Sequence, residues 1–290
     1  MIKTYYKLTK PGVLYGNVLT AVAGFLLASG YFKTFDLVLF AATIAGMTLV
    51  IASACVLNNV FDRDIDKLME RTKNRGVASG RVDSKPATIF SVVLGILGIA
   101  ILALWVNWLV VAIGLAGFIV YVWLYGALSK RKSIHGTAVG SVSGAAPILA
   151  GYAAVSGNID TAAILLFLAL FFWQFPEFYS IAIFRKKEYA AAKVPVMTVV
   201  KGVKSTKIQI FIYTIAFVVA SLLLSVFGYT SWLYFVVMAV FGLVWIRLGA
   251  LGLTTKYNEA WARQMFRYSL LILIVFSVMV SADNFIVQLF

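Results

Sequence analysis

Residues 58–80 read NNVFDRDIDKLMERTKNRGVASG and begin at the end of a long apolar run. Asn58, Asp62 and Asp66 stand four residues apart, so on a continuous helix their side chains share one face over about two turns. One amide oxygen and two carboxylates are the hard-oxygen ligands that Mg²⁺ prefers, usually together with phosphate oxygens and water. The spacing therefore predicts that Asn58, Asp62 and Asp66 bind magnesium.

Acidic residues are concentrated in this stretch. Asp62, Asp64, Asp66 and Glu70 lie close together, although the whole chain holds only 11 acidic residues. Acids are unfavourable at the C-terminus of a helix, where the macrodipole is negative, and a bound cation would offset that repulsion. The alternative is a solvated helix end of the kind that flanks many membrane helices.

Basic residues follow the acids. Arg71, Lys73 and Arg75 form a cluster suited to a diphosphate, because guanidinium and ammonium groups make charge-assisted hydrogen bonds to phosphate oxygens. A metal site beside such a cluster predicts a substrate that carries a diphosphate.

The composition places this stretch in a membrane protein. Hydrophobic residues make up 62% of the 290 residues, charged residues only 12%, and the mean hydropathy is +0.95, which excludes a soluble globular domain. The single Cys55 provides no disulfide framework. The long first apolar run lacks a small-residue cleavage site and predicts a retained helix. The net charge of +14 indicates anionic lipid or phosphate partners and no nucleic acid.

Nine segments are long and apolar enough to cross a bilayer, which takes about 20 residues of helix. They are 12–31, 38–59, 88–106, 108–128, 138–156, 162–184, 208–227, 231–252 and 267–287. We therefore expect an all-α polytopic membrane protein. It would be a nine-transmembrane-helix bundle in one domain over 1–290, with a central cavity opening at the cytoplasmic side.

Basic residues also predict the orientation. With the N-terminus in the cytoplasm, every Lys and Arg except Lys33 falls on the inner side. This bias follows the positive-inside rule and fits an odd number of spans, so the C-terminus is expected outside. The two long inner loops, about 60–87 and 185–207, are the expected active-site loops.

A second polar cluster ends the sixth segment. Glu177 lies with Gln174 inside an apolar span, where an ionisable group is costly and therefore a functional candidate. Glu177 and Glu188 are eleven residues apart and would share a face of a continuous helix, beside Arg185 and Lys187. Two simpler interpretations stay open. Glu177 could only hydrogen-bond a neighbouring helix, and Glu188 could only pair with Arg185.

The two clusters together suit one chemistry. If the second and sixth segments pack side by side, acids and bases face each other over a cavity. Metal and cations would stabilise a diphosphate leaving group, and a dry apolar bundle would protect a carbocation from water. The sequence thus favours ionisation of an allylic diphosphate. A transporter whose path is lined by Gln174 and Glu177 is the rival class, but no paired repeat is evident.

Small residues crowd the fifth segment, which reads GTAVGSVSGAAP over 136–147. Membrane helices pack closely through such residues, so one interpretation is a tight seam between helices. The other is a helix thinned to leave room for a flat ligand, with Ser141 and Ser143 as polar lining.

These motifs resemble a known family. The strip at 58, 62 and 66, followed by MERT at 69–72 and Arg75, is similar to the first signature of the UbiA-type intramembrane prenyltransferases. Within that superfamily, four further stretches resemble the protohaem IX farnesyltransferase (haem O synthase) family. They are TKPG at 9–12, GSVSGAAP at 140–147, WQFP at 173–176 and IAIFR at 181–185 with Tyr189.

The resemblance implies a nine-helix fold and a reaction. Farnesyl diphosphate would be ionised with Mg²⁺, its first carbon would join a vinyl group of haem b, and water would quench the cation to give haem O. The implied setting is the bacterial-type cytoplasmic (inner) membrane. Farnesyl diphosphate, haem b and the lipid bilayer are the implied partners, with haem A synthase or terminal-oxidase assembly proteins. The alternative is a member of the superfamily that acts on an aromatic or quinone precursor.

Carried over by position, the resemblance implies Mg²⁺–diphosphate binding by the strip and a second site at Arg185 and Glu188. Two positions depart from the family pattern: Glu177 stands where His commonly follows WQxP, and Glu188 stands where Asp is common. Glu177 could act as the base for the quenching water, and His135 is the only imidazole left for haem. The predicted catalytic residues are Asp62, Asp66, Glu177 and Arg185. The predicted substrate-binding residues are Arg71, Lys73, Arg75, Lys187, Glu188, Tyr189 and His135.

Overall fold

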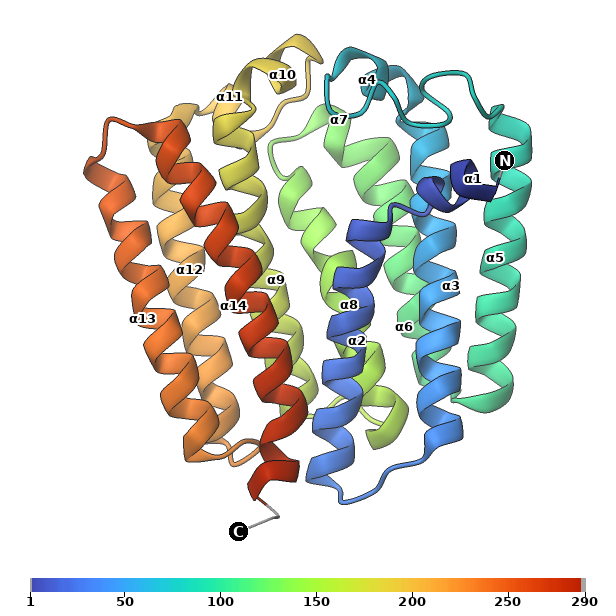
Figure 1. Ribbon diagram of the computed structural model, residues 1–290, viewed down its shortest axis with the longest axis vertical. Helices are drawn as coiled ribbons and strands as arrows, with labels where there is room; N and C mark the ends of the chain where they lie inside the picture. The colour runs from blue at the N-terminus through green and yellow to red at the C-terminus, as the bar shows by residue number, and fades with distance from the viewer. Residues whose placement is uncertain (1, 288–290) are drawn as a thin grey trace.

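The computed structural model describes residues 2–287, and helices are the only regular elements in that range. Nine helices of this part of the chain are long and apolar enough to cross a membrane, which confirms the predicted bundle (Figure 1). They are α2 (Pro11–Tyr31), α3 (Leu37–Phe61), α5 (Ser84–Trp105), α6 with its extension (Trp108–Lys132), α8 (Gly136–Ser156), α9 (Thr161–Phe184), α12 (Gly202–Val226), α13 (Trp232–Thr254) and α14 (Asn258–Val287).

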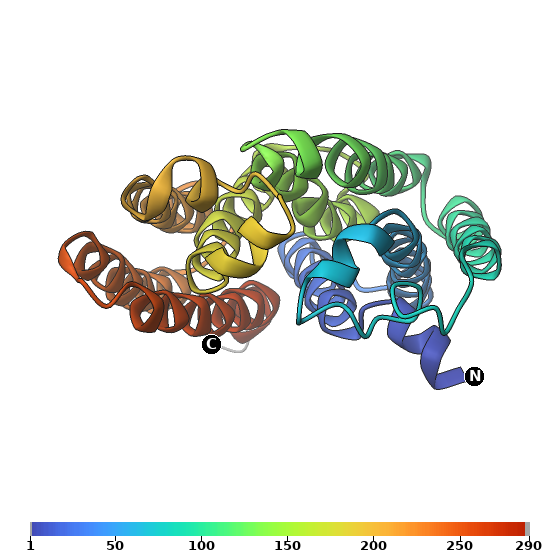
Figure 2. The same cartoon turned by 90° about the horizontal axis from the view of Figure 1, so that it is seen from above.

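Short helices gather at one end of the bundle, which we call the loop end. They are α1 (Ile2–Leu8), α4 (Arg63–Leu68), α7 (Lys130–Lys132), α10 (Lys186–Ala191) and α11 (Met197–Val200). Figure 1 shows this end at the top, whereas α14 runs to the opposite end, which we call the cap end. Seen from above, α4 and α10 lie on the same end of the molecule (Figure 2).

The helix α6 (Trp108–Ile119) begins at a side-chain cap and continues into an unusual segment. Asn107 accepts a hydrogen bond from the Val110 amide at 2.9 Å and donates to the Ala153 carbonyl at 3.1 Å, so one residue joins two spans. The next ten residues, η1 (Val120–Ser129), form a π-helix. Such segments are rare and occur often at functional sites. It carries the chain to Lys130 at the loop end.

Small residues of α8 form a seam. A Cβ at Gly151 would lie 2.0 Å from the Ala21 carbonyl oxygen of α2, and a Cβ at Gly144 would lie 2.1 Å from Oε1 of Gln174. Gln174 itself donates to the Ser141 carbonyl of α8 at 3.1 Å. These contacts support the seam interpretation of the fifth segment, because only glycine permits backbones to approach this closely. They also make Gln174 a structural residue.

The largest differences from the predicted boundaries are at the starts of two helices. α12 begins at Gly202 rather than at 208, and α14 begins at Asn258 rather than at 267. The added turns of α14 contain Glu259 and Arg263. Hydropathy marks the part of a helix that lies in the hydrocarbon, and not the polar turns that extend beyond it.

Candidate active site

The acidic strip lies where α3 passes into α4. α3 ends at Phe61, and α4 begins at Arg63. Across this break the Asp62 amide still donates to the Asn58 carbonyl at 2.9 Å, and the Asp66 amide donates to the Asp62 carbonyl at 2.8 Å. The four-residue spacing therefore persists. Asn58, Asp62 and Asp66 are all buried, with 2%, 0% and 2% of their surface exposed, so the structure brings the three predicted ligands together.

The break corrects one argument made from the sequence. Asp64 and Asp66 lie in the first turn of α4 and not at a helix C-terminus. Asp64 also pairs with Arg131 at 2.7 Å, which holds the pKa of that carboxyl well below its usual value. Repulsion at a helix end was therefore the wrong reason to expect a metal, because the local backbone and the neighbouring cation already stabilise these acids.

Both aspartates of the strip are paired with buried or half-buried cations. Nζ of Lys130, from α7, lies 2.5 Å from Oδ2 of Asp62. Nη1 of Arg75 contacts both carboxylate oxygens of Asp66, at 3.1 and 2.8 Å. Removing one partner of such a buried ion pair strongly destabilises the folded protein, because the other charge is left buried without compensation. Arg75 was a predicted site residue, whereas the sequence indicated for Lys130 only a position on the inner side of the membrane.

Lys10 is a further site residue that the sequence analysis did not single out. Its ammonium donates a hydrogen bond to Oδ1 of Asn58 and lies 5.9 Å from the ring centre of Tyr121. Burial lowers the pKa of Lys10 to about 8, and the neighbouring Arg75 acts in the same direction. The TKPG stretch at 9–12 could have pointed to Lys10 as a site residue. A Lys at the start of a membrane span is, however, equally explained by the orientation of that span.

Unpaired buried oxygens show that the site has free ligand capacity. Within residues 2–287, Oδ1 of Asp62 and Oε2 of Glu188 are buried and have no hydrogen-bond partner. Such atoms cost free energy unless something binds them. The described residues hold no group of three His, Cys, Asp or Glu that could bind a metal. Two carboxylates and an amide nevertheless fit Mg²⁺ when phosphate oxygens complete its shell.

The second cluster differs from its predicted geometry. α9 ends at Phe184, Arg185 caps it, and α10 begins at Lys186, so Glu177 and Glu188 do not share one continuous helix. That expectation was wrong because the chain turns at Arg185. Arg185 and Glu188 form an ion pair at 2.6 Å, as the simpler interpretation held, but Oε2 of Glu188 stays unpaired.

The two predicted active-site loops pack against each other. Ile65 and Met69 form a buried cluster with Ala192 and Val194, and the half-buried Tyr189 packs against it. Burial raises the pKa of Tyr189. Three cations act in the opposite direction, and they come from three different segments: Arg71, Lys130 and Arg185. Basic residues from these three segments therefore lie around one region of the loop end.

Glu177 lies deeper in the bundle. It is half-buried and makes no hydrogen bond or ion pair within the described residues. Trp173 donates to the Ser269 carbonyl of α14 at 2.8 Å, and Gln174 faces α8. Helical geometry places Glu177 about 40° from Trp173, between these two directions. α2 packs against both α8 and α14, so Glu177 points toward the middle of the bundle.

Three other predicted residues lie at the surface of the loop end. Lys73 pairs with Glu70 at 2.7 Å, Lys187 is exposed, and His135 is exposed at the start of α8. The structure does not bring them to the acidic strip. Their assignment stays a prediction.

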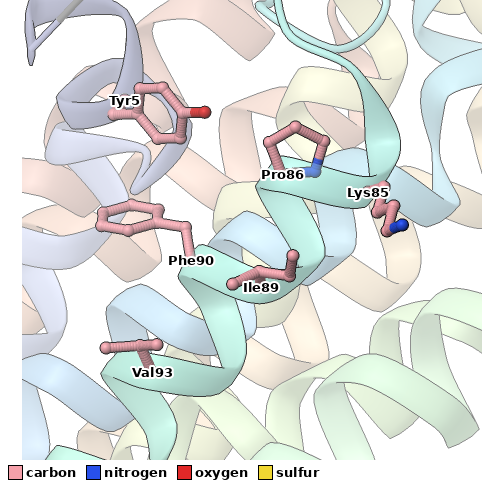
Figure 3. A pocket seen from close by; sticks show the side chains of 6 residues that line it. All are labelled: Tyr5, Lys85, Pro86, Ile89, Phe90 and Val93. Carbon is pink, nitrogen blue, oxygen red and sulfur yellow. The ribbon is translucent and has the colours of Figure 1, made fainter.

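Two surface hollows lie apart from the acidic strip. One is a groove between α1 and α5, which is lined in part by Val93 (Figure 3). In this groove the rings of Tyr5 and Phe90 meet edge to face, with their centres 5.2 Å apart. The other lies beside Asp64 and Arg131. Neither is the central cavity expected from the sequence, so the cavity and its cytoplasmic opening stay predictions.

Comparison with known proteins decides the family. The sequence model of the UbiA prenyltransferase family matches residues 17–271. The chain belongs to this family. Its curated relatives include the protoheme IX farnesyltransferases of Photorhabdus laumondii and Yersinia pseudotuberculosis. Each is 45% identical over 98% of this chain, and the match covers 96% and 95% of the relatives.

Solved structures show the same fold. A UbiA homologue from Archaeoglobus fulgidus bound to GPP and Mg²⁺ matches with a TM-score of 0.69 and 15% identity, over 96% of this chain and 99% of that chain. A structure of digeranylgeranylglyceryl phosphate synthase matches with a TM-score of 0.79 and 20% identity, over 97% and 98%.

Proposed function

We propose that this chain transfers the farnesyl group of farnesyl diphosphate to a vinyl group of haem b and so makes haem O. The observation that carries the proposal is its 45% identity, over 98% of its length, to protoheme IX farnesyltransferases. The buried strip of Asn58, Asp62 and Asp66, ringed by cations, supports a reaction in which a diphosphate leaves. The proposed unit is one prenyltransferase domain over 1–290.

Magnesium is the proposed cofactor. Asn58, Asp62 and Asp66 would hold it together with oxygens of the diphosphate, and the unpaired Oδ1 of Asp62 supports this. When bound, Mg²⁺ supplies charge stabilisation to the departing diphosphate. The A. fulgidus homologue, which was solved with GPP and Mg²⁺, is a precedent in the same fold.

The chain's own residues would then act in sequence. Arg75, Lys130 and Arg185 bind the diphosphate oxygens, so that the C–O bond breaks and its electron pair leaves with the diphosphate. A vinyl carbon of haem b bonds to the first farnesyl carbon, and water adds to the cation left on the neighbouring carbon. Glu177 receives the proton that this water loses. Arg71 and Tyr189 line the same region. The remaining proposed substrate-binding residues are Lys73, Lys187, Glu188 and His135.

The proposed setting is the bacterial-type cytoplasmic membrane, with the loop end and the N-terminus in the cytoplasm and the C-terminus outside. The last residues of the chain, 288–290, lie outside the described part. The proposed partners are haem b, farnesyl diphosphate, and haem A synthase or terminal-oxidase assembly proteins.

One experiment tests the function directly. Purified protein is incubated with haem b, farnesyl diphosphate and Mg²⁺, and the haem is analysed by mass. We expect a haem heavier by one farnesyl group and one hydroxyl group, formed with Mg²⁺ and not with EDTA. An unchanged haem, with prenylation of an added aromatic or quinone precursor instead, would assign a different reaction within the family.

A further inference from the structure

The predicted metal ligands at the loop end are all engaged by basic side chains. Each of the three residues has one cationic partner, although Oδ1 of Asp62 itself has none within residues 2–287, and the three partners come from different parts of the chain. The pairs are Asn58 with Lys10, Asp62 with Lys130 and Asp66 with Arg75.

The charges of this cluster oppose a bare metal ion. The strip carries two negative charges and its partners carry three positive charges, so the cluster has one net positive charge. Two unit charges 4 Å apart interact by about 4 kcal/mol at the effective dielectric constant near a protein surface, so a free divalent cation is repelled. The ion also has to displace Lys130, whose side chain is only 18% exposed and has no other acidic partner within residues 2–287.

A diphosphate reverses this balance. Its oxygens accept charge-assisted hydrogen bonds from ammonium and guanidinium groups, and its charge exceeds the net charge of the cluster. Cations that turn toward the diphosphate release Asn58, Asp62 and Asp66. The released oxygens and the phosphate oxygens then form the shell that Mg²⁺ prefers.

We propose that Mg²⁺ and the diphosphate bind this site only together, because the diphosphate must draw Lys10, Lys130 and Arg75 away from the metal ligands. The proposal rests on the proposed function, since it concerns the same site. It makes the three cations positioning residues that keep the metal ligands covered until the substrate arrives.

Lys10 is the partner most easily released. It binds a neutral amide, whereas Lys130 and Arg75 bind carboxylates. Its backbone is held in the left-handed region at φ 52°, directly before Pro11, which is a costly conformation for a residue with a Cβ. Its flexible four-carbon stem can move from Asn58 to a nearby phosphate without a backbone change.

Metal binding without turnover tests the proposal. Mn²⁺ replaces Mg²⁺, and bound Mn²⁺ is measured by electron paramagnetic resonance on purified protein, with and without an unreactive farnesyl thiodiphosphate. Protein-free samples correct for the Mn²⁺ bound by the analogue. We expect Mn²⁺ alone to bind wild type no better than the Asp62→Asn variant. The analogue should raise the affinity by about 10-fold to 100-fold, a typical coupling, and Mn²⁺ should raise the affinity for the analogue equally.

Variants give effects of opposite sign. Lys130→Met and Lys10→Met should bind Mn²⁺ alone more tightly than wild type, because the ligand is uncovered, and should bind the analogue more weakly. Lys132→Met, an exposed Lys of the same helix α7, is the matched control and should change neither. Size-exclusion profiles and melting temperatures establish which variants are folded. If Lys130→Met does not fold, the proposal is tested by the Mn²⁺ affinity of Lys10→Met and by the coupling between Mn²⁺ and the analogue in wild type.

Two outcomes would overturn the proposal. One is wild-type protein that binds Mn²⁺ equally well with and without the analogue. The other is a folded lysine variant that gains no Mn²⁺ affinity. Both measurements omit haem, so they are independent of the product assay. Coupled binding without haem farnesylation would refute the proposed function alone, and haem farnesylation without coupling would refute this inference alone.

Discussion

Acidic residues at the cap end and at the loop end have different kinds of partners. At the cap end, Asp36 accepts from the amides of Val38 and Leu39 at 2.7 and 2.9 Å and so caps α3. Asp160 caps α9 through the Ala163 amide at 3.1 Å. Asp283, which is fully buried, accepts from the backbone and the hydroxyl of one residue at the start of α13, Ser231, at 2.6 and 2.5 Å.

At the loop end the acids of the strip are bound mainly by side chains. Asp62 and Asp66 pair with Lys130 and Arg75, and Oδ1 of Asp62 has no partner in the described part of the chain. A capping carboxylate satisfies first-turn amides that have no partner within their helix, whereas the cation of a side-chain ion pair can turn to another anion. The comparison teaches that partner type, and not burial, separates a structural acid from a candidate ligand.

The largest expected difference between the two ends is their side of the membrane. Reporter fusions at Arg75, Lys132, Lys201 and Lys256 should report cytoplasm, because the positive-inside rule retains the basic end there. Fusions at Lys33 and Asn158, and at Phe290 beyond the described residues, should report the outer side. Paired cytoplasmic and periplasmic reporters measure this, and one clear reversal would break the orientation.

Asp62→Asn should lower haem O formation by about 10³-fold or more, because the change removes a metal ligand and the charge that opposes Lys130. Product mass and turnover measure the effect at saturating Mg²⁺. Asp160→Asn makes the same chemical change at a helix cap and should keep most of its turnover. Equal losses in the two variants would show that the comparison between the ends is false.

Glu177→Gln should reduce conversion on the order of 10²-fold, the usual effect of losing a general base, while farnesyl diphosphate still binds. Single-turnover assays and binding of the unreactive analogue separate the two quantities. Gln keeps the shape and hydrogen-bonding capacity of Glu177, so normal turnover would make the residue structural. The proton would then leave by another route.

Asp283→Ala should cost about 1–3 kcal/mol of stability, because it leaves the amide and hydroxyl of the half-buried Ser231 without this acceptor. Turnover per folded molecule should stay unchanged. Thermal unfolding in detergent measures the first quantity, and a product assay corrected for folded protein measures the second. Lost activity at full stability would instead connect the cap end to the chemistry.

The nine spans and the polar strip could be predicted from the sequence alone. Span positions follow from the length and polarity of each run, which are local properties, and all nine are present in the structure. The spacing of Asn58, Asp62 and Asp66 survived the helix break, because the backbone hydrogen bonds continue through Asp62. Residue types and their local periodicity therefore predicted which side chains could act together.

The partners of those side chains, in contrast, depend on how the helices pack in three dimensions. Lys10 and Asn58 are 48 residues apart in the chain, and Lys130 and Asp62 are 68 residues apart. The turn at Arg185, which separates Glu177 from Glu188, could not be predicted from the sequence pattern either. Such pairings depend on how the helices pack and where each one ends. That is determined by close contacts between distant segments, and no local sequence pattern records them.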